Sequence, residues 1–117
     1  MQQVTHWAPF KAGAAIGARK IVQITSDGDA EQATANTKGL IGVSGSRAVA
    51  KDGTVEVAIS GIAEVQLGGS VEEGAFIKAD GSGDAVTASA GNGIVGICVV
   101  GGVDGDIGSV LLAPGSA

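Results

Sequence analysis

The feature that most constrains the fold of this chain is an internal duplication. When the sequence is shifted against itself by 55 residues, Gly28 falls on Gly83, and the apolar positions on either side of these glycines coincide. After one deleted residue, the Gly-rich segment 39–43 falls on 93–97. Self-similarity at a fixed spacing is the mark of a repeated supersecondary unit. The sequence therefore predicts a fold built twice from the same element order.

The predicted repeats span about 13–61 and 68–115, and their closing segments match again at the original offset, with Val55 on Val110. Two copies are too few for a solenoid, in which each unit is covered only by its neighbours. A chain of 117 residues is also too short for two independent cores. We therefore expect one β domain over 13–117, with the two copies related by pseudo-symmetry.

The side chains available for a core favour strands. Of 28 aliphatic residues other than alanine, 24 are Val or Ile, which pack well on pleated sheets and lose rotamer freedom in helices. Gly and Asp mark the turns between the segments. The sequence predicts an all-β fold, either a small β-barrel or a β-sandwich. The expected strands are 20–25, 39–44, 54–60, 75–79, 93–100 and 108–113. We expect a bulge or bend at Gly61, and either close backbone approach or a sharp bend at Gly42 and Gly96.

Residues 1–12 lie outside the predicted repeats and form an N-terminal arm that holds the only Trp and the only His. One interpretation is a strand that folds back and covers the end of the barrel with Trp7 and Phe10. The other is an arm that contacts a capsid or a neighbouring subunit, since exposed aromatics are typical interface anchors. For the second interpretation the candidate contact residues are Thr5, His6, Trp7 and Phe10.

Charge and composition limit the partners. A net charge of −5 repels phosphate backbones and anionic lipid surfaces, so we expect neither nucleic acid nor membrane as a partner. No signal peptide or membrane-spanning segment is apparent, and the single Cys98 excludes an internal disulfide, as suits synthesis in a host cytoplasm. The large apolar side chains are few for a chain of this length, so we expect self-association to complete the core.

No motif predicts catalysis, and the sequence indicates no catalytic residue, cofactor or metal. Residues 91–96 match the dinucleotide fingerprint G-x-G-x-x-G, but a β-branched segment follows where the fingerprint requires a helix. The acidic turns at 27–29, 80–84 and 104–106 lack the recurrence and the final Glu of known calcium loops. His6 is the only histidine, so neither a nucleophile–base pair nor a transition-metal site can be assembled around it.

The order of short Gly and Val motifs resembles that of the small capsid decoration proteins, also called cement or head-stabilising proteins, of tailed bacteriophages. The resemblance covers roughly residues 13–113 and rests on the segments 53–65, 71–80, 93–97 and 108–112. It implies a β-barrel-like subunit, commonly a homotrimer, that binds the outer surface of a mature head. It also implies that the partner is the major capsid protein and that the subunit stabilises the virion by bridging capsid subunits.

An alternative from a different class is a small ligand-binding or carbohydrate-binding β module of a fibre or adhesin. Such modules usually stack sugars on several exposed aromatic rings, whereas this chain has one Trp, two Phe and no Tyr. A related shell or tail component with the same β unit would differ from a decoration protein only in its partner.

Overall fold

The computed structural model describes residues 2–35 and 39–116, and these residues form nine β-strands. Met1 of the expected arm and Ala117 of the expected domain lie outside the described residues. The strands are β1 (Gln3–Lys11), β2 (Ile21–Ile24), β3 (Ala30–Gln32), β4 (Leu40–Ser44), β5 (Thr54–Gln66), β6 (Phe76–Ala79), β7 (Ala85–Thr87), β8 (Gly93–Val100) and β9 (Ile107–Ser116). All ladders are antiparallel, and the prediction of an all-β fold is confirmed.

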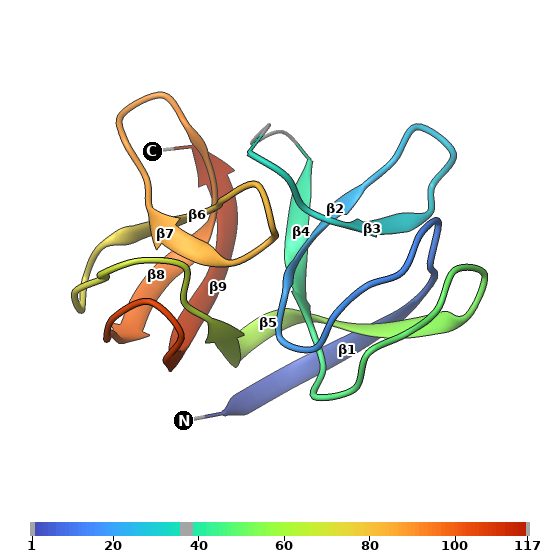
Figure 1. The fold of residues 1–117 in the computed structure, drawn as a ribbon, viewed down its shortest axis with the longest axis horizontal. Helices are drawn as coiled ribbons and strands as arrows, with labels where there is room; N and C mark the ends of the chain where they lie inside the picture. Colours follow the sequence, from blue (N-terminus) through green and yellow to red (C-terminus); the bar gives the residue numbers. More distant parts are fainter. Residues whose placement is uncertain (1, 36–38, 117) are drawn as a thin grey trace.

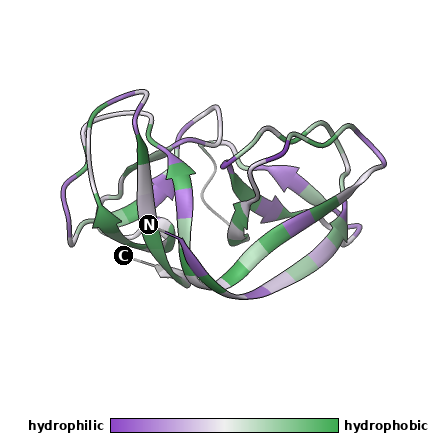
Figure 2. Ribbon diagram, turned by 90° about the horizontal axis from the view of Figure 1, so that it is seen from below, coloured by the Kyte–Doolittle hydropathy of each residue, from purple (hydrophilic) through white to green (hydrophobic). Residues whose placement is uncertain are grey.

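The strand order is β3-β2-β4-β5-β9-β8-β6-β7, with β1 paired to β5 outside this path. The order is therefore mirrored about the β5–β9 pair. The long strand β5 runs beneath both halves of the molecule (Figure 1), and Figure 2 shows the two halves side by side above it. We call β1 to β4 with residues 54–60 of β5 the first lobe, and residues 62–66 of β5 with β6 to β9 the second lobe.

Each lobe is curved like a barrel, but its antiparallel ladders do not close the barrel. A parallel bridge between Ala12 and Ala30 brings the end of β1 to β3, and an equivalent bridge between Leu67 and Ala85 brings the end of β5 to β7. The two bridges are 55 residues apart in the sequence, which is the spacing of the predicted repeat. The sheet as a whole stays open between β3 and β7.

The ladders show that β1 takes part in the duplication. In the first lobe Lys11 pairs with Thr54, and in the second lobe Gln66 pairs with Ile107 in the equivalent place. The strand at residues 3–11 thus corresponds to the second half of β5. The match extends the repeat beyond the segments that sequence alone aligned, and it makes β5 the last strand of the first lobe and the first strand of the second.

The alignment of the closing segments was wrong by two residues. The sequence matched Val55 with Val110 at an offset of 55, but Val110 pairs with Ala63 as Val57 pairs with Ala8. The structural offset in the closing strands is therefore 53. Glycines flank both closing strands, and their coincidence favoured the wrong offset.

Two clusters of buried apolar residues form the core of the protein. The smaller lies inside the first lobe and consists of Ala12, Ile16, Val22, Ala30, Val55 and Val57. The larger fills the second lobe and also contains first-lobe residues Ile21, Leu40, Val43 and Ala58. Because one continuous cluster spans both lobes, they share a core and form one packed unit.

Two mid-strand glycines show close backbone approach, one of the two alternatives that the sequence predicted for them, and a third lies at the predicted bend. A Cβ on Gly42 would overlap the carbonyl oxygen of Ala58, and one on Gly96 would overlap that of Leu111, which is the equivalent contact in the second lobe. Gly61 has a φ of 96°, which favours glycine, and the β1–β5 pairing is irregular beside it. The expected bend in β5 is confirmed at this residue.

Candidate functional site

The four candidate contact residues lie on β1, which pairs with β5 as part of the sheet. Trp7 is half-buried and packs against the larger cluster, while Phe10 is half-buried against the smaller one. These two aromatics cover the core, as the first of the two interpretations expected. Whether the strand also contacts a partner stays a prediction.

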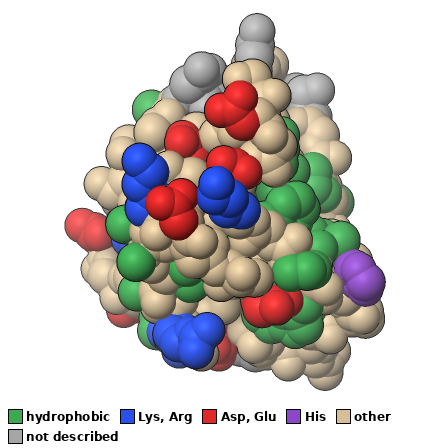
Figure 3. Space-filling view, turned by 90° about the vertical axis from the view of Figure 1, so that its right-hand side faces the viewer, with side chains coloured by type: hydrophobic (Ala, Val, Ile, Leu, Met, Phe, Trp, Pro, Cys, Tyr) green, Lys and Arg blue, Asp and Glu red, His purple; other side chains and the backbone are tan. Residues whose placement is uncertain are grey.

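Thr5 and His6 are the exposed members of the set. The Thr5 hydroxyl shares a hydrogen bond with the hydroxyl of Ser60, which fixes its position against β5. Figure 3 shows the outward face of the first lobe, where acidic and basic side chains gather beside a band of hydrophobic ones and a histidine side chain stands at the margin. A partner approaching β1 from outside would therefore meet Thr5 and His6 before either aromatic ring.

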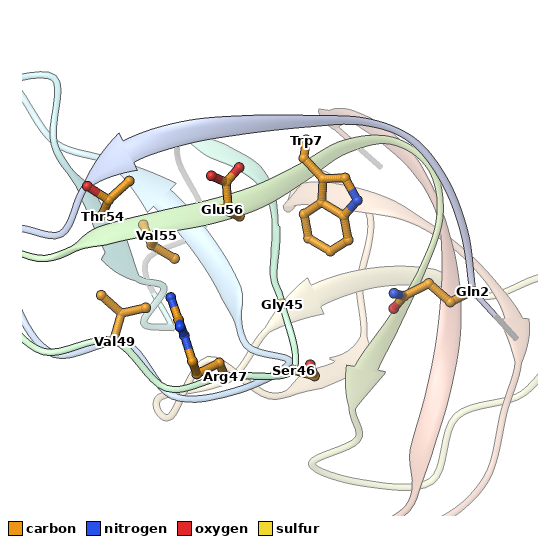
Figure 4. Close-up of a pocket in the computed structure, with 9 residues that line it drawn as sticks. All are labelled: Gln2, Trp7, Gly45, Ser46, Arg47, Val49, Thr54, Val55 and Glu56. Atoms are coloured by element: carbon orange, nitrogen blue, oxygen red, sulfur yellow. The ribbon is translucent and has the colours of Figure 1, made fainter.

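A pocket of about 360 Å³ opens beside Trp7 (Figure 4). Its walls come from β1, from the loop after β4 and from the start of β5, and Gly45 lies against the indole ring, because a Cβ there would stand 3.6 Å from the ring carbon Cζ3. The lining residues are Gln2, Trp7, Gly45, Ser46, Arg47, Val49, Thr54, Val55 and Glu56.

The lining offers one aromatic surface, a cation, a carboxylate, an amide and two hydroxyls. Such a mixture can bind a small polar ligand or a short peptide by stacking and hydrogen bonding. Sequence reasoning pointed to Trp7 alone. Arg47 and Glu56 were missed, because nothing in the sequence shows that the loop after β4 folds back beside the first strand.

In two of the three acidic turns, a carboxylate accepts hydrogen bonds from backbone amides. One oxygen of Asp80 accepts from the Ser82 amide at 2.8 Å and from the Asp84 amide at 3.0 Å, and an oxygen of Asp106 accepts from the Val103 amide at 3.0 Å. These bonds fix the turns, as short acidic side chains do elsewhere. Among residues 2–35 and 39–116, no three His, Cys, Asp or Glu side chains gather as a metal site.

The last four residues of the G-x-G-x-x-G segment at 91–96 are already part of β8, which continues to Val100, so the expected β segment follows the glycines. A pyrophosphate would find no helix N-terminus there. Cys98 is buried on the same strand, and burial, with the nearby Glu73 carboxylate as a smaller cause, raises the pKa of its thiol. No helix that could cross a bilayer occurs in the part of the chain that the structure describes.

Comparison with known proteins gives a structural likeness without a sequence family. No family model matches the chain, and no curated protein is similar to it in sequence. Among solved structures, the N-terminal base of the head fibre gp8.5 of bacteriophage phi29 is similar in fold, with a TM-score of 0.69 and 16% sequence identity. The alignment covers 96% of this chain and 97% of the phage chain. At this identity the likeness establishes a shared fold, and the two chains match over almost their whole lengths.

Proposed function

We propose that this chain is a structural protein of a phage virion that binds the outer surface of the capsid. In this role it stabilises the head by bridging major capsid subunits, as the capsid decoration proteins it resembles do. The observation that carries the proposal is the fold, which matches a phage head-fibre base from end to end. Two independent comparisons, the sequence motifs and the fold, thus point to a component of the phage head.

The physical properties of the chain support a role without chemistry. In two of the three acidic turns a carboxylate accepts hydrogen bonds from backbone amides, and the single thiol is buried. A net charge of −5 suits the outside of a DNA-filled shell better than its inside. We therefore propose a non-catalytic protein that works through its surfaces and that self-associates, with a homotrimer as the expected assembly.

Within this proposal the capsid contact is made by the exposed residues of β1, Thr5 and His6. One edge of β1 pairs with β5, and the strand stands outside the main path of the sheet. An outer strand of this kind can pair with an extended segment of another protein. Trp7 and Phe10 contribute by holding the strand in place, since both pack on the cores.

The test is co-sedimentation of the purified chain with expanded heads assembled from the major capsid protein encoded in the same genome. We expect the chain to pellet with the heads and to raise their resistance to heat. Failure to pellet at high micromolar concentration would overturn the proposed function. The variant His6→Asp, with Lys51→Asp in an exposed loop as a control, tests the surface: equal binding of both variants would exclude β1 as the contact.

The pocket beside Trp7 favours a second candidate, a small ligand-binding or carbohydrate-binding module of a fibre. Its indole ring could stack on a sugar while Arg47 and Glu56 form hydrogen bonds to hydroxyls. A glycan array would test this candidate, and binding that is abolished by Trp7→Leu or Arg47→Ala would support it. An empty array together with head binding would leave the virion role.

A further inference from the structure

The two lobes carry the same row of side chains in different surroundings. In the first lobe a line of cross-strand partners runs across four strands, from Trp7 on β1 to Ala58, Val43 and Ile21 on β2. We call these residues the first row. Ile21, Val43 and Ala58 are fully buried, and all three belong to the larger cluster that continues into the second lobe. The second lobe thus covers the first row.

The equivalent line in the second lobe runs from Ile62 to Leu111, Ile97 and Phe76. We call these residues the second row. Phe76 is 47% exposed and Leu111 is 43% exposed, although both have large apolar side chains. Exposed apolar residues that line up across neighbouring strands mark an interaction surface more strongly than scattered ones do. The second row is therefore a copy of a buried surface that the described part of the chain leaves partly exposed.

Part of what covers the first row is the turn at residues 80–84, which follows β6. The Ile21 amide donates a hydrogen bond to the Gly83 carbonyl at 2.8 Å, and the Gln32 side-chain amide donates to the Ser82 carbonyl at 2.7 Å. Lys20 pairs with Asp84 beside these bonds. Contact between the lobes thus joins the start of β2 in one lobe to the first hairpin turn of the other.

The first lobe has the same turn, at residues 25–29, and its tip at Gly28 stands in open space. Gly28, the equivalent of Gly83, has no neighbour within 4 Å of a Cβ position, whereas a Cβ on Gly83 would press on Gln32. Ile24, the equivalent of the fully buried Ala79, is 37% exposed. We call residues 24–29 the free turn. The chain therefore exposes both surfaces of a second such contact: the second row, and the free turn, which corresponds to the turn that covers the first row.

If the lobes were related by a closed twofold axis, the free turn would cover the second row within the same chain. Instead, the turn of the second lobe packs on the row of the first lobe, and the reverse contact is not made. The free turn and the second row can therefore meet only between two chains. The side chains at these two surfaces also favour an apolar contact. Phe76 stands where the covered row has Ile21, and Ile24 stands where Ala79, the last residue of β6, leads into the covering turn.

We propose that copies of this chain associate head to tail, with the free turn of one copy packed on the second row of the next. The inference deepens the proposed self-association by naming its two surfaces, and it rests on that part of the proposed function. The partner is a second copy of this chain, because the interface repeats one that already exists between the lobes. Head-to-tail contacts form a ring where the rotation closes, and a closed ring is the expected assembly.

The experiment measures the molar mass of the intact chain by light scattering over a wide range of concentrations. We expect an assembly of defined mass, and we expect Phe76→Lys and Ile24→Lys each to give monomers by raising the dissociation constant at least about 30-fold, as loss of an apolar anchor does. Val103→Lys is the matched control, because Val103 is 57% exposed and apolar but lies in neither surface. It should leave the assembly unchanged.

Mixing the two lysine variants tests the direction of the contact. Each variant keeps one good surface, so the mixture should form a heterodimer of two chains and no larger species. If either lysine substitution unfolds the chain, Phe76→Gln and Ile24→Gln replace it. A monomeric wild-type chain, assembly that survives both substitutions, or a mixture that stays monomeric would overturn the inference.

Co-sedimentation with heads separates this inference from the proposed function. A chain that assembles as described and does not bind heads overturns capsid binding alone. A chain that binds heads as a monomer overturns the head-to-tail contact alone.

Discussion

Strand β4 packs closely against β5 at Gly42, in the middle of β4. A Cβ on this residue would overlap the carbonyl oxygen of Ala58 and stand 3.0 Å from a methyl group of Val57. The β4–β5 ladder consists of two pairs only, Val43 with Ala58 and Ser44 with Val57. Gly42→Ala must therefore push β4 away from β5 at the place where the two strands are joined.

The loss of stability in Gly42→Ala has two parts, overpacking and weakened hydrogen bonds. Overpacking a tight site costs about 1–3 kcal/mol, and weakening one or two ladder hydrogen bonds adds about 1 kcal/mol each. We expect Gly42→Ala to lower the free energy of unfolding by about 3–4 kcal/mol, a large part of the roughly 5–15 kcal/mol that stabilises a typical domain. With a urea dependence of about 1.3 kcal/mol per molar, the midpoint should fall by about 2–3 M.

Gly45→Ala, three residues along the same chain segment, is the matched control. Its φ lies outside the left-handed region, and a Cβ there would make ordinary contact with the Trp7 ring at 3.6 Å. We expect this substitution to stabilise the protein by about 0.4–1 kcal/mol, because alanine lowers the entropy of the unfolded chain. Urea unfolding followed by far-ultraviolet circular dichroism measures both changes, and a loss below about 1 kcal/mol in Gly42→Ala would refute the packing argument.

Four further predictions test separate features of the structure. Asp80→Ala should cost about 1–2 kcal/mol in urea unfolding, because two backbone amides lose their acceptor, whereas Asp80→Asn keeps an oxygen and should cost less. Lys20→Gln should cost about 1 kcal/mol by the same measurement, since Asp84 loses its partner between the lobes. Cys98 should react with a disulfide reagent roughly a hundredfold more slowly in the folded chain than in urea, because the reaction requires local opening. Since burial raises the pKa of that thiol, the free energy of unfolding should also fall as the pH rises above the ordinary thiol pKa of 9.0; Cys98→Ala should remove this dependence.

The strands could be predicted from sequence because local residue types determine where each strand begins and ends. Gly and Asp at the turns and runs of Val and Ile between them placed 93–100 correctly and most other strands within a residue or two at each end. The mid-strand glycines also had a local signal, since Gly42 and Gly96 interrupt otherwise apolar strands. Close backbone approach was the physical reason, and the structure has it at both residues.

The role of β1 could not be predicted from the same signals. Trp7, Pro9 and Phe10 share no residue type with their equivalents in β5, so the shifted sequence matches there only at Ala8 and Ala63. The equivalence rests on ladder register, which depends on which strands pair. The pocket was missed for a related reason. Arg47 and Trp7 are distant in sequence, and they line the same pocket only because β1 pairs with β5.

Because the turn of one lobe packs on the row of the other and the reverse contact is not made, substitutions are constrained differently in the two lobes. The covered half of the contact, at Ile21 and Gly83, must stay complementary, because the larger core depends on it. The uncovered halves are free to change, and in a protein that worked alone they would be expected to become polar, as solvent-facing strand residues usually do. They carry Phe76, Leu111 and Ile24 instead. Retained apolar side chains at both unused halves are what a chain needs if the contact is repeated between molecules, and that is the reason to mutate these surfaces before the aromatic residues of β1.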